Sequence, residues 1–167
     1  MFRSTDFILA RLPLLFLLLI CCARTLAQDD HHGHEHHHEH RNEIGIANAP
    51  VYFVKEKSVS YGLHLHYVRN LLHSRLGYGL GYERIFDEHG HNTYSAVVSY
   101  RVDAISFILA PGVTLEDEEP DHAAFAVHAE ATYEFQLGDV HLGPVLEFAY
   151  DPEDIHISLG LHVGIGF

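Results

Sequence analysis

The sequence predicts an all-β protein: an eight-stranded antiparallel up-and-down transmembrane β-barrel, preceded by a signal peptide and a disordered histidine-rich tail. Three observations lead to this fold class. The first 27 residues have the layout of a secretory signal. From Glu43 onward, apolar and polar residues alternate with a period of two, which is typical of β-strands. Most of these segments reach the 9–11 residues that a tilted membrane strand needs, whereas strands of soluble proteins usually have about five or six.

The N-terminal segment combines Arg3 and Arg11 with the apolar run 12–22 and the small residue Ala27. This layout predicts a signal peptide, residues 1–27, that is cleaved after Ala27. A retained membrane anchor is the alternative, but the apolar run is shorter than the roughly 20 residues of a membrane-spanning helix. Cleavage would remove both cysteines of the chain, so the mature protein is expected to have no disulfide.

Residues 28–42 read QDDHHGHEHHHEHRN and contain no apolar side chain that could anchor them to a core. This composition predicts a disordered tail on the periplasmic side. Imidazole is a good ligand for zinc, copper and nickel, and the interleaved glutamates add oxygen donors. We therefore expect the tail to bind transition-metal ions, most plausibly zinc. Its candidate ligands are His31, His32, His34, His36, His37, His38 and His40. A solvated spacer and an expression tag are the alternatives.

The remaining residues, 43–167, contain eight candidate strands. They are predicted at 43–54, 58–69, 75–86, 92–102, 104–116, 122–137, 140–151 and 155–167. The alternation is clearest in the last of them, where every second residue from Ile155 to Phe167 is apolar and the residues between are His, Ser or Gly. The connections after the second, fourth and sixth strands are brief. They are predicted to be the periplasmic turns, and the more charged connections to be the outer loops.

The apolar faces of these strands could form the core of a soluble sandwich or the lipid-facing surface of a barrel. Aromatic residues near the strand ends favour the barrel, because such residues form girdles at the membrane interfaces. The narrow interior of an eight-stranded barrel also suits the many glycines of the polar faces. Closure removes the exposed edges that such long strands would otherwise present. The polar faces are therefore predicted to fill the lumen.

A second group of histidines is predicted to lie in this lumen, near the middle of the barrel. Its members are His64, His66, His128 and His162. Two of them, His64 and His66, share one face of a strand about 7 Å apart. They could bind an ion together if further ligands reached it from across the lumen. This group is therefore predicted to form a metal site or a relay.

A polar plug is the alternative for the lumen, because buried charges are costly unless they are paired. Arg75 and Arg101, facing Glu134, would be a plug of this kind. At the predicted outer rim, His89 and His91 lie beside carboxylates in the segment DEHGHN. That rim could concentrate divalent cations or could simply be a solvated acidic surface.

The signal peptide, the eight alternating strands and the terminal LGLHVGIGF resemble the small eight-stranded outer-membrane β-barrel proteins of Gram-negative bacteria. In that class a C-terminal aromatic residue, here Phe167, resembles the signal read by the barrel assembly machinery. The resemblance implies location in the cell outer membrane and contact with outer-membrane lipid. The histidine-rich leader followed by NEIGIANAPVYFVKEK is also similar to small barrel proteins of the Bacteroidetes type. We expect a monomer.

One motif of the sequence would also fit an enzymatic function. The lipid A deacylases, a group of barrel enzymes, use a His-x-Ser pair with an acid, and His156-Ile157-Ser158 matches this spacing. The alternation points the pair into the lumen, whereas an enzyme acting on membrane lipid needs it to face lipid. We therefore expect no enzymatic activity and no required cofactor, although zinc or another divalent transition metal could bind.

The net charge of −13 argues against nucleic acid as a partner and fits attraction for cations. The predicted function is an outer-membrane barrel whose histidine-rich tail binds or buffers transition-metal ions, associated with metal uptake or homeostasis. A structural or interaction barrel with a polar-plugged lumen and no metal role is the alternative.

Overall fold

The computed structural model describes residues 40–117, 122–152 and 154–167. The predicted signal peptide and most of the tail, with His31, His32, His34, His36, His37 and His38, lie outside these residues. The strands are β1 (Asn42–Phe53), β2 (Ser58–Asn70), β3 (Leu76–Ile85), β4 (His91–Val102), β5 (Ile105–Glu116), β6 (Ala123–Tyr133), β7 (Phe135–Leu137), β8 (Val140–Tyr150) and β9 (Ile155–Gly166). Apart from the division between β6 and β7, their bounds agree with the predicted strands to within one residue.

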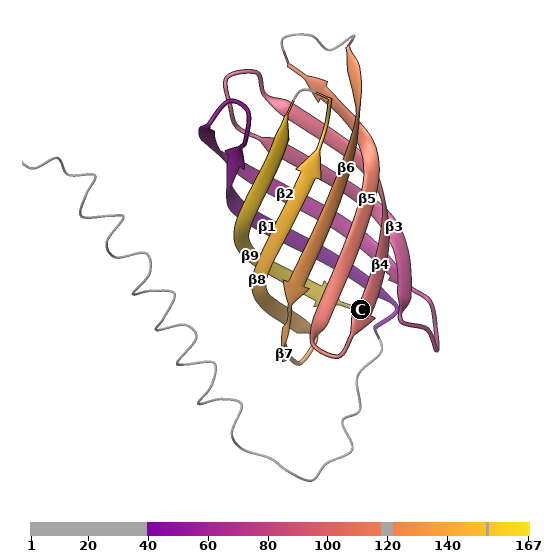
Figure 1. Cartoon of the computed structure of the whole chain (residues 1–167). Coiled ribbons are helices and arrows are strands. Elements are labelled where there is room, and N and C mark those ends of the chain that lie inside the picture. The colour runs from indigo at the N-terminus through magenta and orange to yellow at the C-terminus, as the bar shows by residue number, and fades with distance from the viewer. Residues whose placement is uncertain (1–39, 118–121, 153) are drawn as a thin grey trace, which may run out of the picture. The chain divides into compact units, whose positions relative to one another are not determined.

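The strands form one antiparallel sheet that closes on itself (Figure 1). Its order is β6-β5-β4-β3-β2-β1-β9-β8-β7, and β6 also pairs with β8. Both β6 and β7 pair with β8 in one continuous register, so they make up a single strand of the barrel. The protein is therefore a closed eight-stranded barrel, which confirms the predicted fold class. The last strand closes against the first, with Ile165 opposite Ile44.

The break between β6 and β7 differs from the continuous strand predicted over residues 122–137. In the shared register, Tyr133 and Glu134 fall opposite Pro144 and Gly143. Proline has no backbone N–H to donate, so the ladder is interrupted there. On the other side of the strand, the N–H of Glu134 donates to the carbonyl oxygen of Ala104, at 2.7 Å, and continues the ladder with β5. A proline on the neighbouring strand, rather than any residue of the strand itself, therefore causes the break.

The barrel is apolar outside and mainly polar inside. Two small apolar clusters also lie in the interior, Val68 with Val97, Ile108 and Ala110, and Val51 with Phe53 and Ile85. In β1, the buried positions alternate strictly with exposed ones, and Ile44 and Ile46 point outward. Exposed aromatic side chains form two girdles. One girdle comprises Tyr52, Tyr61, Phe86, Tyr94, Phe125 and Tyr150, and the other comprises Tyr78, Tyr100, Phe107, Tyr133 and Phe167. This arrangement is that of a barrel surrounded by lipid. Among the described residues, no helix is long and apolar enough to cross a membrane.

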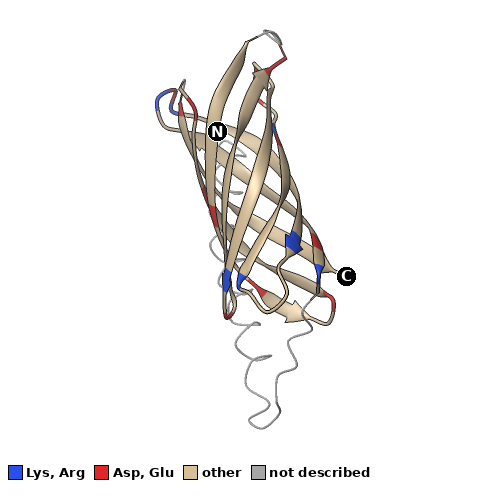
Figure 2. Ribbon diagram, turned by 90° about the vertical axis from the view of Figure 1, so that its right-hand side faces the viewer, with Lys and Arg blue, Asp and Glu red and all other residues tan. Residues whose placement is uncertain are grey.

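The two ends of the barrel differ. At the terminus end, where β1 begins and β9 ends, Asn42 and Phe167 exchange backbone hydrogen bonds of 2.9 and 2.8 Å. The turns Asp103–Ala104 and Gly138–Asp139 at this end have two residues each, as periplasmic turns of such barrels do. The third connection at this end, residues 71–75, has five residues. The opposite end, called the loop end, carries connections of four to six residues. Lysines and arginines gather at the two ends (Figure 2).

Candidate metal centre in the barrel lumen

The lumen contains six buried histidines and four buried glutamates. They are His64, His66, His128, His141, His156 and His162, with Glu43, Glu83, Glu130 and Glu147. Among the described residues, Arg101 is the one arginine or lysine that forms an ion pair with any of these glutamates. Buried carboxylates need a positive partner. Away from Arg101, a protonated imidazole or a bound cation can serve as that partner.

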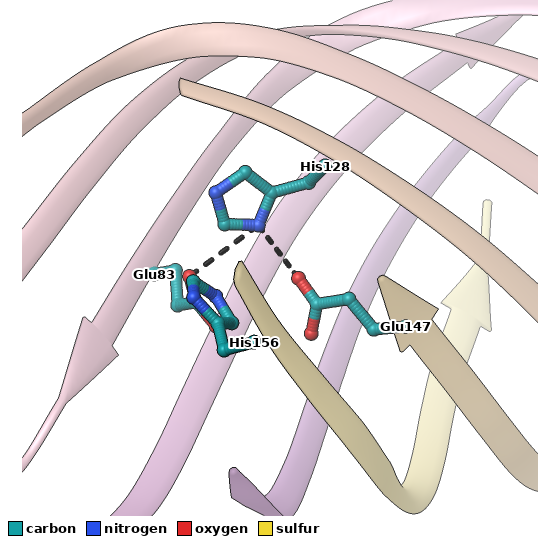
Figure 3. A group of neighbouring side chains, drawn as sticks. All are labelled: Glu83, His128, Glu147 and His156. Carbon is teal, nitrogen blue, oxygen red and sulfur yellow. Dashed lines mark hydrogen bonds and ion pairs between the residues drawn. The ribbon is translucent and has the colours of Figure 1, made fainter. Parts of the chain in front are cut away.

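The first group, the outer cluster, joins four strands near the loop end. Glu83 of β3, His128 of β6, Glu147 of β8 and His156 of β9 point toward one another (Figure 3). A hydrogen bond of 2.6 Å joins His128 Nδ1 and Glu147 Oε1. The same nitrogen lies 3.4 Å from Glu83 Oε2, and His156 Nε2 lies 3.9 Å from that oxygen. One donor atom from each residue falls within 4.8 Å of all the others.

Strand register brings the outer cluster together. Ala149 of β8 pairs with His128 on one side and with His156 on the other. Because Ala149 is small and fully buried, the two imidazoles approach over it, with ring centroids 5.6 Å apart. One step further along β8, Glu147 pairs in the same way with Glu130 and Ser158. The cluster is thus fixed by three neighbouring strands, and Glu83 completes it from across the lumen.

The second group, the middle cluster, consists of His64, His66 and Glu130. His64 Nδ1 lies 2.7 Å from Glu130 Oε1. The two imidazoles lie on one face of β2, as predicted, with ring centroids 5.6 Å apart. Gly81 pairs with His66, and a Cβ added there would lie 3.2 Å from His64 Nε2. The glycine of β3 therefore leaves the space that the rings occupy.

The third group, the inner cluster, lies nearer the terminus end and consists of Glu43, His141 and His162. His141 Nε2 lies 3.2 Å from Glu43 Oε1. Arg101 adds a guanidinium, with Nη2 2.9 Å from Glu43 Oε2 and 3.3 Å from a carboxylate oxygen of Glu134. This part of the predicted plug is therefore present.

Two sequence predictions at the terminus end have different outcomes. Arg75, predicted to face Glu134 in the lumen, is exposed in the turn after β2. It lies one residue before β3 begins. Its carbonyl oxygen still accepts a hydrogen bond of 2.8 Å from the N–H of Arg101, but its side chain is exposed. His40, the tail histidine among the described residues, lies at the end of the barrel, with Nε2 3.4 Å from Asp139 Oδ1.

The four histidines predicted as one lumen site are divided among the three clusters. His64 and His66 are together, whereas His128 belongs to the outer cluster and His162 to the inner one. Sequence reasoning left out His141 and His156 as ligands, although their alternation places them in the lumen. It also assigned no ligand role to the glutamates, because their distance from a given imidazole depends on pairing across the barrel.

The Ser158 hydroxyl is not arranged as a nucleophile. It is buried in the lumen and donates a 3.1 Å hydrogen bond to Glu147 Oε2. The other oxygen of Glu147 is hydrogen-bonded to His128. The carboxylate thus stands between serine and imidazole, whereas a catalytic triad needs the imidazole beside the serine. The side chains of His156 and Ser158 also face away from lipid, as the alternation predicted.

The donor set of the outer cluster fits zinc. Two imidazoles and two carboxylates are ligands that zinc accepts, with metal–ligand distances of about 2.0–2.2 Å. Tetrahedral ligands at that range lie about 3.4 Å from one another. The observed donor separations of 2.6, 3.4 and 3.9 Å bracket this value. Both ring nitrogens of His156 are also buried without a hydrogen-bond partner among the described residues, so they are available to a cation.

Comparison with known proteins identifies the fold. No family model matches the chain, and no curated protein matches its sequence. The solved structure of Neisserial surface protein A, from Neisseria, is 10% identical over 75% of this chain and 96% of that chain, with a TM-score of 0.52. The outer-membrane protein Ail of Yersinia pestis, in a phospholipid bilayer nanodisc, is 14% identical over 75% and 99%, with a TM-score of 0.50. Together with the apolar outer surface, this fold places the chain in the outer membrane, as predicted.

Proposed function

We propose that this outer-membrane barrel binds transition-metal ions in its lumen, zinc above all, at the outer cluster. The observation that carries the proposal is the convergence of Glu83, His128, Glu147 and His156 from four strands. Four donors from separate strands hold their positions through the rigid barrel rather than through a flexible loop. Such preorganisation favours binding, because less side-chain freedom is lost when the ion arrives.

Charge supports a cation at this place. Glu83, Glu130 and Glu147 are buried in the outer and middle clusters, and no described lysine or arginine is ion-paired with them. A divalent cation bound by neutral imidazoles would compensate two of these negative charges at once. Imidazole has to be neutral to bind a metal, so binding is expected to weaken as the pH is lowered.

The histidine-rich tail has a complementary role in this proposal. It precedes β1, so it emerges at the terminus end, the end with the short turns that face the periplasm in such barrels. Its imidazoles would capture or buffer ions on that side with little selectivity. Barrel and tail together would then serve metal uptake or homeostasis.

Zinc titration of the full chain by calorimetry tests the lumen site and the tail separately. In the tail-substituted chain, the seven tail histidines are replaced by Asn, and zinc binding should persist. Adding Glu147→Gln to that chain should weaken binding by about tenfold or more, whereas Glu88→Gln, at an exposed loop carboxylate, should not. Equal affinity in the Glu147→Gln and Glu88→Gln chains would rule out the outer cluster. Equal binding by the intact and tail-substituted chains would rule out the role of the tail.

The structural plug has observations of its own in its favour. Arg101 joins Glu43 and Glu134, and His64 lies against Glu130, so several charges already have partners. A plug needs no ion, whereas a bound ion stabilises the folded state by about 2.7 kcal/mol when its concentration is 100 times the Kd. Thermal unfolding of the tail-substituted chain with zinc and with a chelator separates the two functions. An unchanged midpoint would favour the plug.

A further inference from the structure

The three clusters lie in series along the lumen. Strand register gives their order, because His156 pairs with Phe53 at the loop end of β1, while His162 pairs with Ala47 further down. Next to it on β9, Gly164 pairs with His141, close to the turn between β7 and β8. The outer, middle and inner clusters therefore follow one another from the loop end toward the terminus end.

The imidazoles of these clusters touch one another in a single file, which we call the histidine column. Its members, from the loop end, are His156, His128, His64, His66, His162 and His141. Successive ring centroids are separated by 5.6, 6.4, 5.6, 5.1 and 5.4 Å. Two steps connect different clusters. The ring centroids are 6.4 Å apart from His128 to His64 and 5.1 Å apart from His66 to His162, similar to the separations within clusters.

Both ends of the column lead toward solvent. At the loop end, a cavity of about 240 Å³ is lined by Phe53, Glu56, His89, His91, Glu116, Asp151 and Asp154. The ring of Phe53 contacts the rings of both His91 and His156, at 5.9 and 5.4 Å. The buried ring of Phe53 therefore separates this cavity from the first histidine of the column and contacts the histidine on each side. Its acidic lining would raise the local concentration of cations.

At the terminus end, the column finishes at His141 and Glu43, beside Arg101. The Arg101 side chain is 39% exposed, so water reaches the lumen at this level. Its guanidinium holds Glu43 by one oxygen, while the other oxygen faces His141. An ion at the inner cluster would therefore lie one side chain away from solvent, beside the partly exposed Arg101.

From this geometry we infer that the histidine column passes transition-metal ions stepwise through the barrel, between the loop-end cavity and the terminus end. The inference rests on the proposed metal binding and adds transport to it. An ion held by one cluster can gain an imidazole of the next cluster before it releases its last donor, because neighbouring rings are in contact. Each step is a ligand exchange with no redox change, and the glutamates offset the charge of the ion along the way.

Glycines make the column possible. A Cβ added at Gly45 would overlap the rings of His66 and His162, and one added at Gly164 would overlap the ring of His141. A lumen built only as a plug would be expected to fill such positions with side chains that interdigitate. In this lumen, the imidazole rings of the column occupy that space instead.

Zinc entry into vesicles tests the inference. The tail-substituted full chain is reconstituted in phospholipid vesicles that contain a zinc-sensitive fluorophore, and zinc is added outside. We expect zinc entry clearly faster than in protein-free vesicles. The double substitution His64→Asn with His66→Asn, which removes only the middle cluster, should slow entry by about tenfold or more. His122→Asn, at an exposed histidine outside the lumen, is the matched control and should leave the rate unchanged.

Calorimetry of the same proteins separates failure of transport from failure of binding. The double variant should lose zinc binding at the middle cluster and retain that of the outer cluster, whose donors it leaves unchanged. Zinc binding without zinc entry in the parent chain would overturn the relay and leave the proposed function standing. No binding at all would overturn both. Unchanged entry in the double variant would show that ions pass elsewhere. If the double variant does not fold, as judged by heat-dependent gel migration, His64→Gln alone takes its place with the same expected direction.

Discussion

The imidazole rings of His66 and His162 lie face to face, with centroids 5.1 Å apart and planes inclined by 9°. They come from β2 and β9, the two neighbours of β1, and they meet over Gly45 of β1. This stack joins the middle cluster to the inner one. A single glycine in the first strand therefore decides whether the histidine column is continuous.

Alanine substitutions at two lumen glycines should differ in cost. At Gly45 the new methyl group would meet imidazole rings that can turn aside, but at Gly143 it would meet the backbone carbonyl oxygen of Tyr133, which cannot move without shifting a strand. We expect Gly143→Ala to lower the free energy of unfolding by about 2–3 kcal/mol and Gly45→Ala by about 1 kcal/mol. Denaturant unfolding in micelles measures both, with Ile46→Val on the lipid face as the control. A larger cost for Gly45→Ala would contradict this assignment.

Removal of the guanidinium of Arg101 should destabilise the barrel. In Arg101→Met, the carboxylates of Glu43 and Glu134 would lose the cation that lies between them. Since Arg101 is partly exposed, we expect a loss of about 1–3 kcal/mol in the free energy of unfolding, the range for a buried group left without its partner. Adding Glu134→Gln should restore part of the loss. Full additivity of the two substitutions would show that these side chains are not coupled.

The ion pair between Arg84 and Asp117 should make the stability of the loop end depend on pH. Hydrogen bonds from the Arg84 guanidinium, at 2.9 and 2.5 Å, and from Asn92 lower the pKa of Asp117 to about 2 from its ordinary 3.8. Because the pKa of Asp117 is lowered in the folded state, the pair stabilises the folded state fully above about pH 3.8. This stabilisation is lost as the pH falls through about 2. Arg84→Gln should therefore return the pKa of Asp117 toward 3.8.

Carbon NMR of the Asp117 carboxyl group, followed through acid titration, measures this shift. Lys57→Gln removes a different cation of the loop end and should leave the titration unchanged. An unchanged pKa of Asp117 in Arg84→Gln would mean that the guanidinium is not its main partner.

The carboxylate of Asp154 should hold two loops together. It accepts backbone hydrogen bonds from Lys55, Glu56 and Ile155, at 2.8, 3.2 and 2.6 Å, and so ties the β1–β2 connection to the β8–β9 connection. Each bond contributes about 0.5–1.5 kcal/mol. In Asp154→Ala, we expect the amide hydrogens of Lys55 and Glu56 to exchange with solvent about tenfold faster. Exchange in Glu88→Ala should match that of the parent chain, and equal rates in all three proteins would disprove the tie.

The barrel itself could be predicted from the sequence because the pattern that specifies it is local. A side chain's face depends only on whether its position is odd or even along the strand. Ile155, Ile157 and Leu159 therefore point outward and His156 and Ser158 inward, whatever the neighbouring strands are. The length of the alternating segments and the short turns then select a membrane barrel over a soluble sandwich.

At two places, the alternation of apolar and polar residues does not predict the structure correctly. Arg75 was predicted to face the lumen by extending the alternation past the start of β3, and it lies exposed in a turn instead. The strand predicted over residues 122–137 divides at Glu134 because Pro144, on another strand, cannot donate. Both differences lie next to the end of a strand.

The alternation of residues was enough to predict which side chains enter the lumen, but which of them meet depends on the closed fold. His128 and His156 lie 28 positions apart in the chain and approach because Ala149 pairs with both. His64 and His66 are two residues apart, yet their carboxylate partner Glu130 comes from a strand on the far side of the closed sheet. Closure and register depend on all the strands at once, since each strand's pairing limits the next. A histidine-lined lumen is therefore a property of the sequence, whereas three separate clusters joined in one column are a property of the fold.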